Sequence, residues 1–93
     1  MKTKKRQFTV ADFDATLVSG PYAWPGCYPL FFVTDDGEAL SFDSALAEAD
    51  LIRESIASNS RDEWHVVAVE VNWEDEDLRC AHSGEVIESA YGN

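Results

Sequence analysis

The chain has 93 residues, 45% of them hydrophobic, and a formal net charge of −11 at pH 7. This length forms one small domain, and three Trp, three Tyr and five Phe are too many for an acidic chain that stays disordered. From Gln7 onward the chain holds three Arg, no Lys and all 18 acidic residues, a net charge of −15, which disfavours direct binding to nucleic acid and favours a basic protein partner.

Residues 1–7 hold four of the seven basic side chains and are expected to form a flexible basic tail ahead of a single acidic domain at 8–93. They are not expected to begin a signal peptide, because Asp12 and Asp14 break the stretch that would have to be apolar. No 18-residue apolar segment exists, so no membrane span is predicted. Two cysteines are too few for a disulfide scaffold and fit a reducing compartment, so the expected location is the cytoplasm.

The first predicted element is a short helix between Thr9 and Gly20. Thr9 and Asp12 have the spacing of a capping pair, and apolar residues recur after them at helical intervals. The segment Pro21–Pro29 carries prolines at four-residue intervals, so no regular structure is expected there. Its aromatic residues form either a recognition loop or a lid folded back on the core; they are Tyr22, Trp24 and Tyr28.

A β-hairpin is the clearest local signal in the chain. Two apolar runs, Leu30–Thr34 and Ala39–Phe42, flank Asp36-Gly37, which is typical of a tight hairpin turn. One main amphipathic helix over about 43–58 follows directly, because its apolar residues share one face. These residues are Ala45, Ala49, Ile52 and Ile56.

A further strand is predicted over 64–73, where apolar residues alternate between two faces. Its end emerges toward solvent at the acidic residues 74–77, and Leu78–Cys80 with Val86–Ile87 are predicted to form a last small hairpin. Together these elements predict an α+β fold, with antiparallel hairpins, one main helix and a short N-terminal helix.

No catalytic site is predicted, so the chain is not expected to be an enzyme. Its histidines, cysteines and carboxylates do not fall in a spacing that specifies an active site. His65 opens a strand beside Trp64, where an ordinary edge histidine is favoured over a catalytic base. Cys80 and His82 offer two metal ligands, and Cys27 or His65 can supply others, but a structural zinc site needs two closely spaced pairs. No metal and no other cofactor is therefore expected.

Three motifs follow one another along the chain: Tyr22–Thr34, Val71–Asp75 and Ile87–Gly92. Between them stand Gly37, Leu40, Leu78 and Gly84. This order resembles that of a group of small phage and plasmid proteins with a zinc-ribbon-like centre, over most of residues 9–92. In that group one Cys-x-x-Cys knuckle follows the first hairpin and a second precedes the terminal motif. The resemblance implies a mobile-element origin, a ribbon-like architecture and, for the expected cytoplasmic location, a bacterial host cell.

The knuckle positions that the resemblance implies fall on Ser41 with Ser44 and on Cys80 with Ser83, so three of the four expected sulfurs are hydroxyls. A serine hydroxyl is a poor zinc ligand at neutral pH, because it is not readily deprotonated. His82 can replace one ligand but cannot complete a tetrahedral site with Cys80 alone. We therefore expect the metal site to be lost and the architecture to be kept, with Ser41 and Ser44 as helix caps.

Acidic residues crowd the solvent end of the predicted strand, where carboxylates can mimic nucleic-acid phosphates and aromatic residues can anchor a partner. The expected partner-binding residues are Glu70, Trp73, Glu74, Asp75, Glu76 and Asp77, with Tyr22, Trp24 and Tyr28 as secondary candidates. The expected partner is a basic surface on a nucleic-acid-binding host defence protein, which makes the chain an inhibitor of the anti-CRISPR or anti-restriction type. The competing interpretation of this segment is a solvated turn whose charges keep sheet edges from pairing.

Two other classes of function fit the same sequence. One is a structural or adaptor domain descended from a zinc ribbon. The other is an antitoxin or immunity protein that neutralises a basic toxin through the same acidic surface. The sequence does not specify an oligomeric state.

Overall fold

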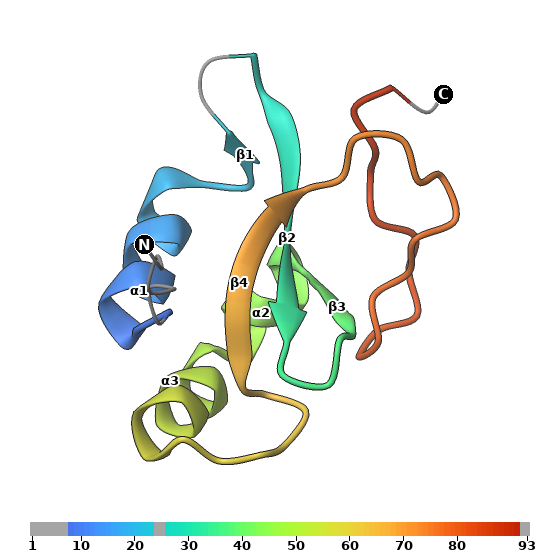
Figure 1. Ribbon diagram of the computed structural model, residues 1–93. Coiled ribbons are helices and arrows are strands. Elements are labelled where there is room, and N and C mark those ends of the chain that lie inside the picture. The colour runs from blue at the N-terminus through green and yellow to red at the C-terminus, as the bar shows by residue number, and fades with distance from the viewer. Residues whose placement is uncertain (1–7, 24–25, 92–93) are drawn as a thin grey trace, which may run out of the picture.

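The structure, a computed structural model, describes residues 8–23 and 26–91. Three helices and a four-stranded antiparallel sheet form the fold, so the predicted α+β class is confirmed (Figure 1). The elements in chain order are α1 (Val10–Ser19), β1 (Tyr22–Ala23), β2 (Tyr28–Thr34), β3 (Ala39–Ser41), α2 (Phe42–Ala47), α3 (Ala49–Ser58) and β4 (Val66–Val71). The predicted basic tail at 1–7 lies outside the described residues. Within the described part, no helix has the length and apolar character needed to cross a membrane.

β2 is the central strand of the sheet. β4 pairs with one edge of β2, and β1 and β3 pair in succession with the other edge. The register places Leu30 opposite Val71 at one end of β2 and Phe32 opposite Val69 near its middle. This pairing brings the start of β2 next to the residues that follow β4, which is where the candidate site lies.

Local signals account for α1 and the β2–β3 hairpin, which are both confirmed. Thr9 and Asp12 form a capping box, with Asp12 N donating to Thr9 Oγ1 at 3.1 Å and Thr9 N donating to Asp12 Oδ2 at 2.9 Å. Gly37 has a φ of 85° in the hairpin turn, a value that glycine adopts without strain. The last predicted hairpin is also present, as a bridge between Arg79 and Val86.

The prediction of a single main helix over 43–58 is wrong in one respect, because the structure divides this helix into α2 and α3. The backbone of Glu48 leaves helical values, with φ −110° and ψ 30°. No proline or glycine lies at this point. The break is therefore a tertiary effect, and it lets Ala45 on α2 and Ile52 on α3 both be completely buried.

The expectation that 21–29 has no regular structure is also wrong, because β1 pairs with the start of β2. Tyr22 lies opposite Pro29 and Ala23 opposite Tyr28. Leu30 N donates to Pro21 O at 3.0 Å, on the edge of β2 that faces β1. Because successive backbone nitrogens in a strand point to opposite edges, the nitrogen of Pro29 points away from β1. Proline is tolerated here because this pairing does not need its missing N–H group.

The core lies between the sheet and the helices. The ring of Phe32 on β2 is completely buried, with its centroid 5.3 Å from that of Phe13 on α1 and 6.0 Å from that of Phe42 on α2. Ile52 and Val66 are completely buried in the same cluster. Cys80 and Ile87 join it from the C-terminal segment, which therefore packs as an integral part of the domain.

Candidate functional site

Three aromatic residues from separate segments meet at one end of the sheet, and we call Tyr28, Trp73 and Tyr91 the aromatic stack. Trp73 lies with its ring centroid 4.7 Å from that of Tyr28 and 6.0 Å from that of Tyr91, whose ring is inclined to it by only 18°. Asn72 N donates to Pro29 O at 3.0 Å, which holds Trp73 beside Tyr28, and Tyr91 N donates to Trp73 O at 2.8 Å. Trp73 is 47% exposed and Tyr91 67% exposed, so the stack is open to a partner.

Asn72 ties three segments together beneath the aromatic stack. Its side chain is buried, and Nδ2 donates to the carbonyl oxygens of Asp75, Ile87 and Glu88 at 3.0, 3.2 and 3.1 Å. Its Oδ1 accepts from Asp75 N at 3.2 Å. One buried amide therefore fixes both the turn after β4 and the C-terminal segment on the end of the sheet.

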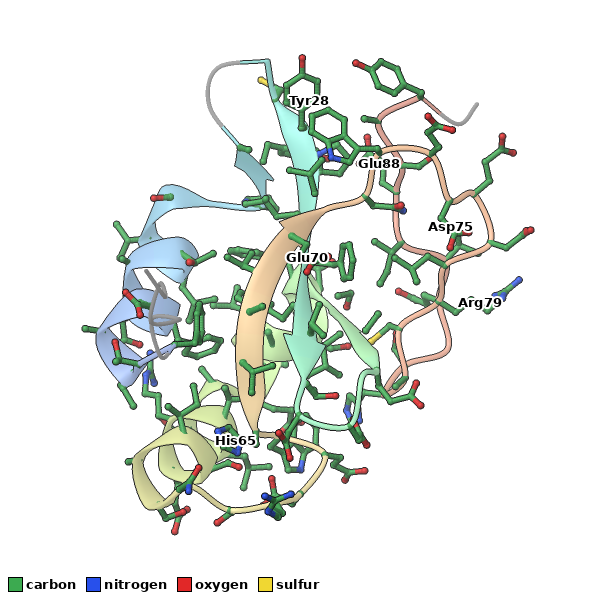
Figure 2. The ribbon with its side chains drawn as sticks, viewed as in Figure 1. Tyr28, His65, Glu70, Asp75, Arg79 and Glu88 are labelled. Atoms are coloured by element: carbon green, nitrogen blue, oxygen red, sulfur yellow. The ribbon has the colours of Figure 1, made fainter. Side chains whose placement is uncertain are left out.

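The acidic turn, Glu74–Asp77, projects beside the stack, and Figure 2 shows Asp75 on the loop that follows β4. All of its side chains are exposed. Asp75 Oδ1 accepts from Asp77 N at 3.0 Å and so shapes the turn itself. Among the described residues no basic side chain pairs with Glu74, Glu76 or Asp77, so these carboxylates are available to a cationic partner.

The secondary candidates are divided among different environments. Tyr28 belongs to the aromatic stack, while the hydroxyl of Tyr22 donates to Glu88 Oε1 at 2.7 Å. That hydrogen bond raises the pKa of the Tyr22 phenol, and the charge of Glu88 acts in the same direction. The prediction for Trp24 falls outside the described residues.

Glu70 does not belong to the acidic turn, although it was predicted together with it. The register places Glu70 opposite Phe31, on the face of the sheet turned away from Phe32 and the helices. Its side chain is exposed on that open face, as Figure 2 shows. A partner that contacts the acidic turn reaches Glu70 only by extending over the sheet.

The four knuckle positions also come together, around the sulfur of Cys80. Ser41 N donates to Cys80 Sγ at 3.3 Å, and Ser44 Oγ lies 3.4 Å from the sulfur, within hydrogen-bond distance. Ser83 contributes hydrogen bonds from its backbone and side chain. Burial raises the pKa of the Cys80 thiol, these hydrogen bonds lower it, and the net effect is a pKa of about 6. The buried sulfur of Cys80 thus occupies one of the four ligand positions that the resemblance implies, and serines occupy the other three.

The other predicted metal and catalytic candidates have separate environments. Across residues 8–23 and 26–91, no three His, Cys, Asp or Glu side chains group together in a way that could hold a metal ion. His82 Nε2 lies 3.9 Å from Glu48 Oε2, and the ring of His82 packs edge-on against Trp64. His65 is buried, with Nδ1 2.6 Å from Ser60 O, where it holds the loop before β4.

Sequence reasoning located the acidic turn and named Trp73, but it missed Asn72 and Glu88. The only signal for Asn72 was a polar residue at the end of an apolar strand, and its partners lie as many as 16 positions away. No sequence pattern pointed to Glu88, because the residue that it pairs with, Tyr22, lies 66 positions away in the chain. Comparison of the chain with protein-family models, curated proteins and solved structures gives no match.

Proposed function

We propose that the chain is an acidic inhibitor that binds the basic, nucleic-acid-binding surface of a host defence protein, as anti-CRISPR and anti-restriction proteins do. The observation that most supports this is the placement of the aromatic stack and the acidic turn side by side at one end of the sheet. Neither group alone distinguishes a binding surface from a solvated turn.

The chemistry of the two groups is complementary to a channel that holds nucleic acid. Such channels present Lys and Arg side chains, which pair with carboxylates and also stack on aromatic rings. The carboxylates of Glu74, Glu76 and Asp77 supply the charge, and the half-exposed rings of Trp73 and Tyr91 supply apolar area for anchoring. Because Asn72 fixes the turn, less conformational entropy is lost on binding.

Capture from a bacterial lysate at low salt tests this proposal with three immobilised proteins: wild type, the double variant Glu74→Gln/Glu76→Gln, and a control, Glu54→Gln/Glu85→Gln. The control removes the same charge from exposed positions elsewhere. We expect wild type and control to retain the same basic nucleic-acid-binding protein, excess duplex DNA to release it, and the turn variant to retain much less. Equal capture by all three proteins, or capture that DNA does not affect, contradicts the proposal.

A second candidate function, a structural or adaptor domain, is favoured by the cluster around Cys80. Ser41, Ser44 and Ser83 all contact its sulfur, so the four knuckle positions of the resemblance lie together, while the C-terminal segment packs into the core. In that case the acidic turn is a solvated edge, and the turn variant binds partners as wild type does. The antitoxin alternative predicts the same sensitive surface but a basic toxin as the captured protein.

A further inference from the structure

A pocket of about 300 Å³ lies at the end of β2 opposite the aromatic stack. β2 begins at Tyr28, in the aromatic stack, and ends at the β2–β3 hairpin, and Figure 1 shows the course of the strand between these ends. The hairpin, the loop before β4 and the C-terminal segment line the pocket, chiefly through Asp36, Glu38, Leu40, Glu63, Trp64 and His82. The proposed function does not use this pocket.

The walls of the pocket are held in place by specific contacts. Asp62 Oδ1 accepts from Ser55 Oγ at 2.6 Å and from Trp64 N at 3.0 Å, which anchors the loop to α3. The ring of Trp64 then meets the ring of His82 edge-on, with centroids 5.0 Å apart and planes inclined by 66°. Ala81 N donates to Ala39 O at 2.8 Å and joins the C-terminal segment to β3. The pocket is therefore preformed.

The pocket carries negative charge that no Lys or Arg of the described chain neutralises. Asp36 accepts a hydrogen bond from the hydroxyl of Thr34, but no Lys or Arg within residues 8–23 and 26–91 pairs with Glu38 or Glu63. Arg61, from the same loop, is directed to Asp35 at 3.8 Å and does not line the pocket. Unpaired carboxylates beside an indole ring favour a cationic ligand.

We propose that this pocket binds the guanidinium group of an arginine side chain presented by a protein partner. A guanidinium is planar and weakly hydrated, so it can pair with carboxylates in a bidentate manner and stack on Trp64, whereas the ammonium group of lysine keeps its water more strongly. The α-ammonium and α-carboxylate of free arginine cancel in charge, so the free amino acid gains no net attraction to Asp36, Glu38 and Glu63 beyond that of its guanidinium. A protein partner presents the guanidinium alone, because the α-groups of its arginine are part of peptide bonds.

Titration with Nα-acetylarginine amide, followed by the backbone amide signals of the protein, tests the proposal. We expect signals from 34–40, 63–64 and 81–82 to shift, with roughly millimolar affinity for this single side chain. The lysine analogue should bind more weakly, free arginine should bind no more tightly than the probe, and the neutral citrulline analogue should cause no shifts. Equal binding of citrulline, tighter binding of free arginine, or the absence of shifts overturns the proposal.

Variants distinguish binding of the arginine probe in this pocket from binding at the acidic turn. Glu38→Gln/Glu63→Gln should weaken binding of the arginine probe by at least about fivefold, because two charged contacts are lost. The control Glu54→Gln/Glu85→Gln removes the same charge and should leave the affinity unchanged, and unshifted amide signals outside the pocket verify that each variant is folded. If the probe instead shifts the signals of 74–77 and loses affinity in Glu74→Gln/Glu76→Gln, the pocket proposal fails while the proposed function stands.

Discussion

At the scale of single residues, the fold changes the chemistry of Cys80 more than that of any other group whose pKa shift is resolved in the described chain. The side chain is only 1% exposed, yet its hydrogen bonds with three serines outweigh burial and lower its pKa from 9.0 to about 6. Between about pH 6 and 9 the unfolded chain therefore binds more protons at this position than the folded chain. The contribution of the thiolate to stability rises with pH across this window and is lost as pH falls through the folded pKa.

Urea denaturation at several pH values checks this prediction by comparing wild type with Cys80→Ser. The free energy of unfolding of wild type, relative to the variant, should increase by up to about 1.4 kcal/mol per pH unit between about pH 6 and 9. Other groups titrate equally in both proteins and cancel in the difference. A difference that stays constant with pH means that the thiol remains protonated in the folded chain.

The convergence of Ser41, Ser44 and Ser83 on Cys80 leads to a prediction about metal binding. Zinc holds four sulfurs at about 2.3 Å, which places neighbouring sulfurs roughly 3.8 Å apart. The 3.4 Å between Cys80 Sγ and Ser44 Oγ is close to that spacing. The triple variant Ser41→Cys/Ser44→Cys/Ser83→Cys should therefore bind one zinc per chain, and its cobalt form should show tetrahedral thiolate bands.

Wild type is the control for this experiment and is expected to contain no stoichiometric zinc. Ser41→Cys/Ser44→Cys, with three sulfurs, should bind more weakly than the triple variant because one ligand is missing. A folded triple variant that takes up no metal means that the four positions lie near one another without ligand geometry, and the ribbon resemblance then loses its support.

At the scale of secondary-structure elements, Asn72 links β4, the acidic turn and the C-terminal segment. Asn72→Asp keeps the shape but turns a carboxylate toward the carbonyls of Asp75, Ile87 and Glu88, which have lost their donor. We expect a loss of roughly 3 kcal/mol in the free energy of unfolding and faster amide exchange in 74–77 and 86–91. Asn59→Asp, at the exposed left-handed C-cap of α3, is the matched control and should cost no more than about 1 kcal/mol, because it places the same new charge at a solvated helix C-terminus. Equal effects of the two substitutions contradict the linking role.

The elements that could be predicted from sequence are those whose signals are local. The capping pair of Thr9 and Asp12 and the Asp36-Gly37 turn act within a few residues, and both elements formed as predicted. The break at Glu48 and the pairing of β1 with β2 depend on packing between distant segments, so they were missed. The candidate site divides in the same way: the acidic turn is contiguous in sequence, whereas the aromatic stack exists only because the β2–β4 register aligns Tyr28 with Trp73.

At the scale of the whole molecule, the net charge of −11 predicts that the chain does not itself bind nucleic acid. A protein gains affinity for DNA by neutralising phosphates and releasing their counterions, and this chain carries 18 acidic residues against seven basic ones. A gel-shift assay with duplex DNA at physiological salt and micromolar protein should show no complex. A retarded band from the protein alone contradicts the acidic-inhibitor proposal.

The same charge should accelerate association with a basic partner, and the distribution of charge decides which carboxylates matter. Glu48 and Asp50 are poor controls for the acidic turn, since Glu48 lies 3.9 Å from His82 and Asp50 accepts from Arg53 at 2.8 Å. Glu54 and Glu85 are exposed and are the better comparison. The association rate with the captured partner should fall steeply as salt rises, because long-range attraction is screened within about 10 Å at 0.1 M.

Stopped-flow or surface-based kinetics can distinguish the effect of net charge from the effect of where the charge lies. The three proteins to compare are wild type, Glu74→Gln/Glu76→Gln and Glu54→Gln/Glu85→Gln. Both variants lose two charges and should associate somewhat more slowly, but only the turn variant should also dissociate faster, because it alone loses direct contacts with the partner. Trp73→Ala should raise the dissociation rate without changing the salt dependence, since it removes an anchor and no charge. If the two charge variants have the same association and dissociation rates, binding depends only on the net charge of the chain, and the acidic turn is not the contact surface.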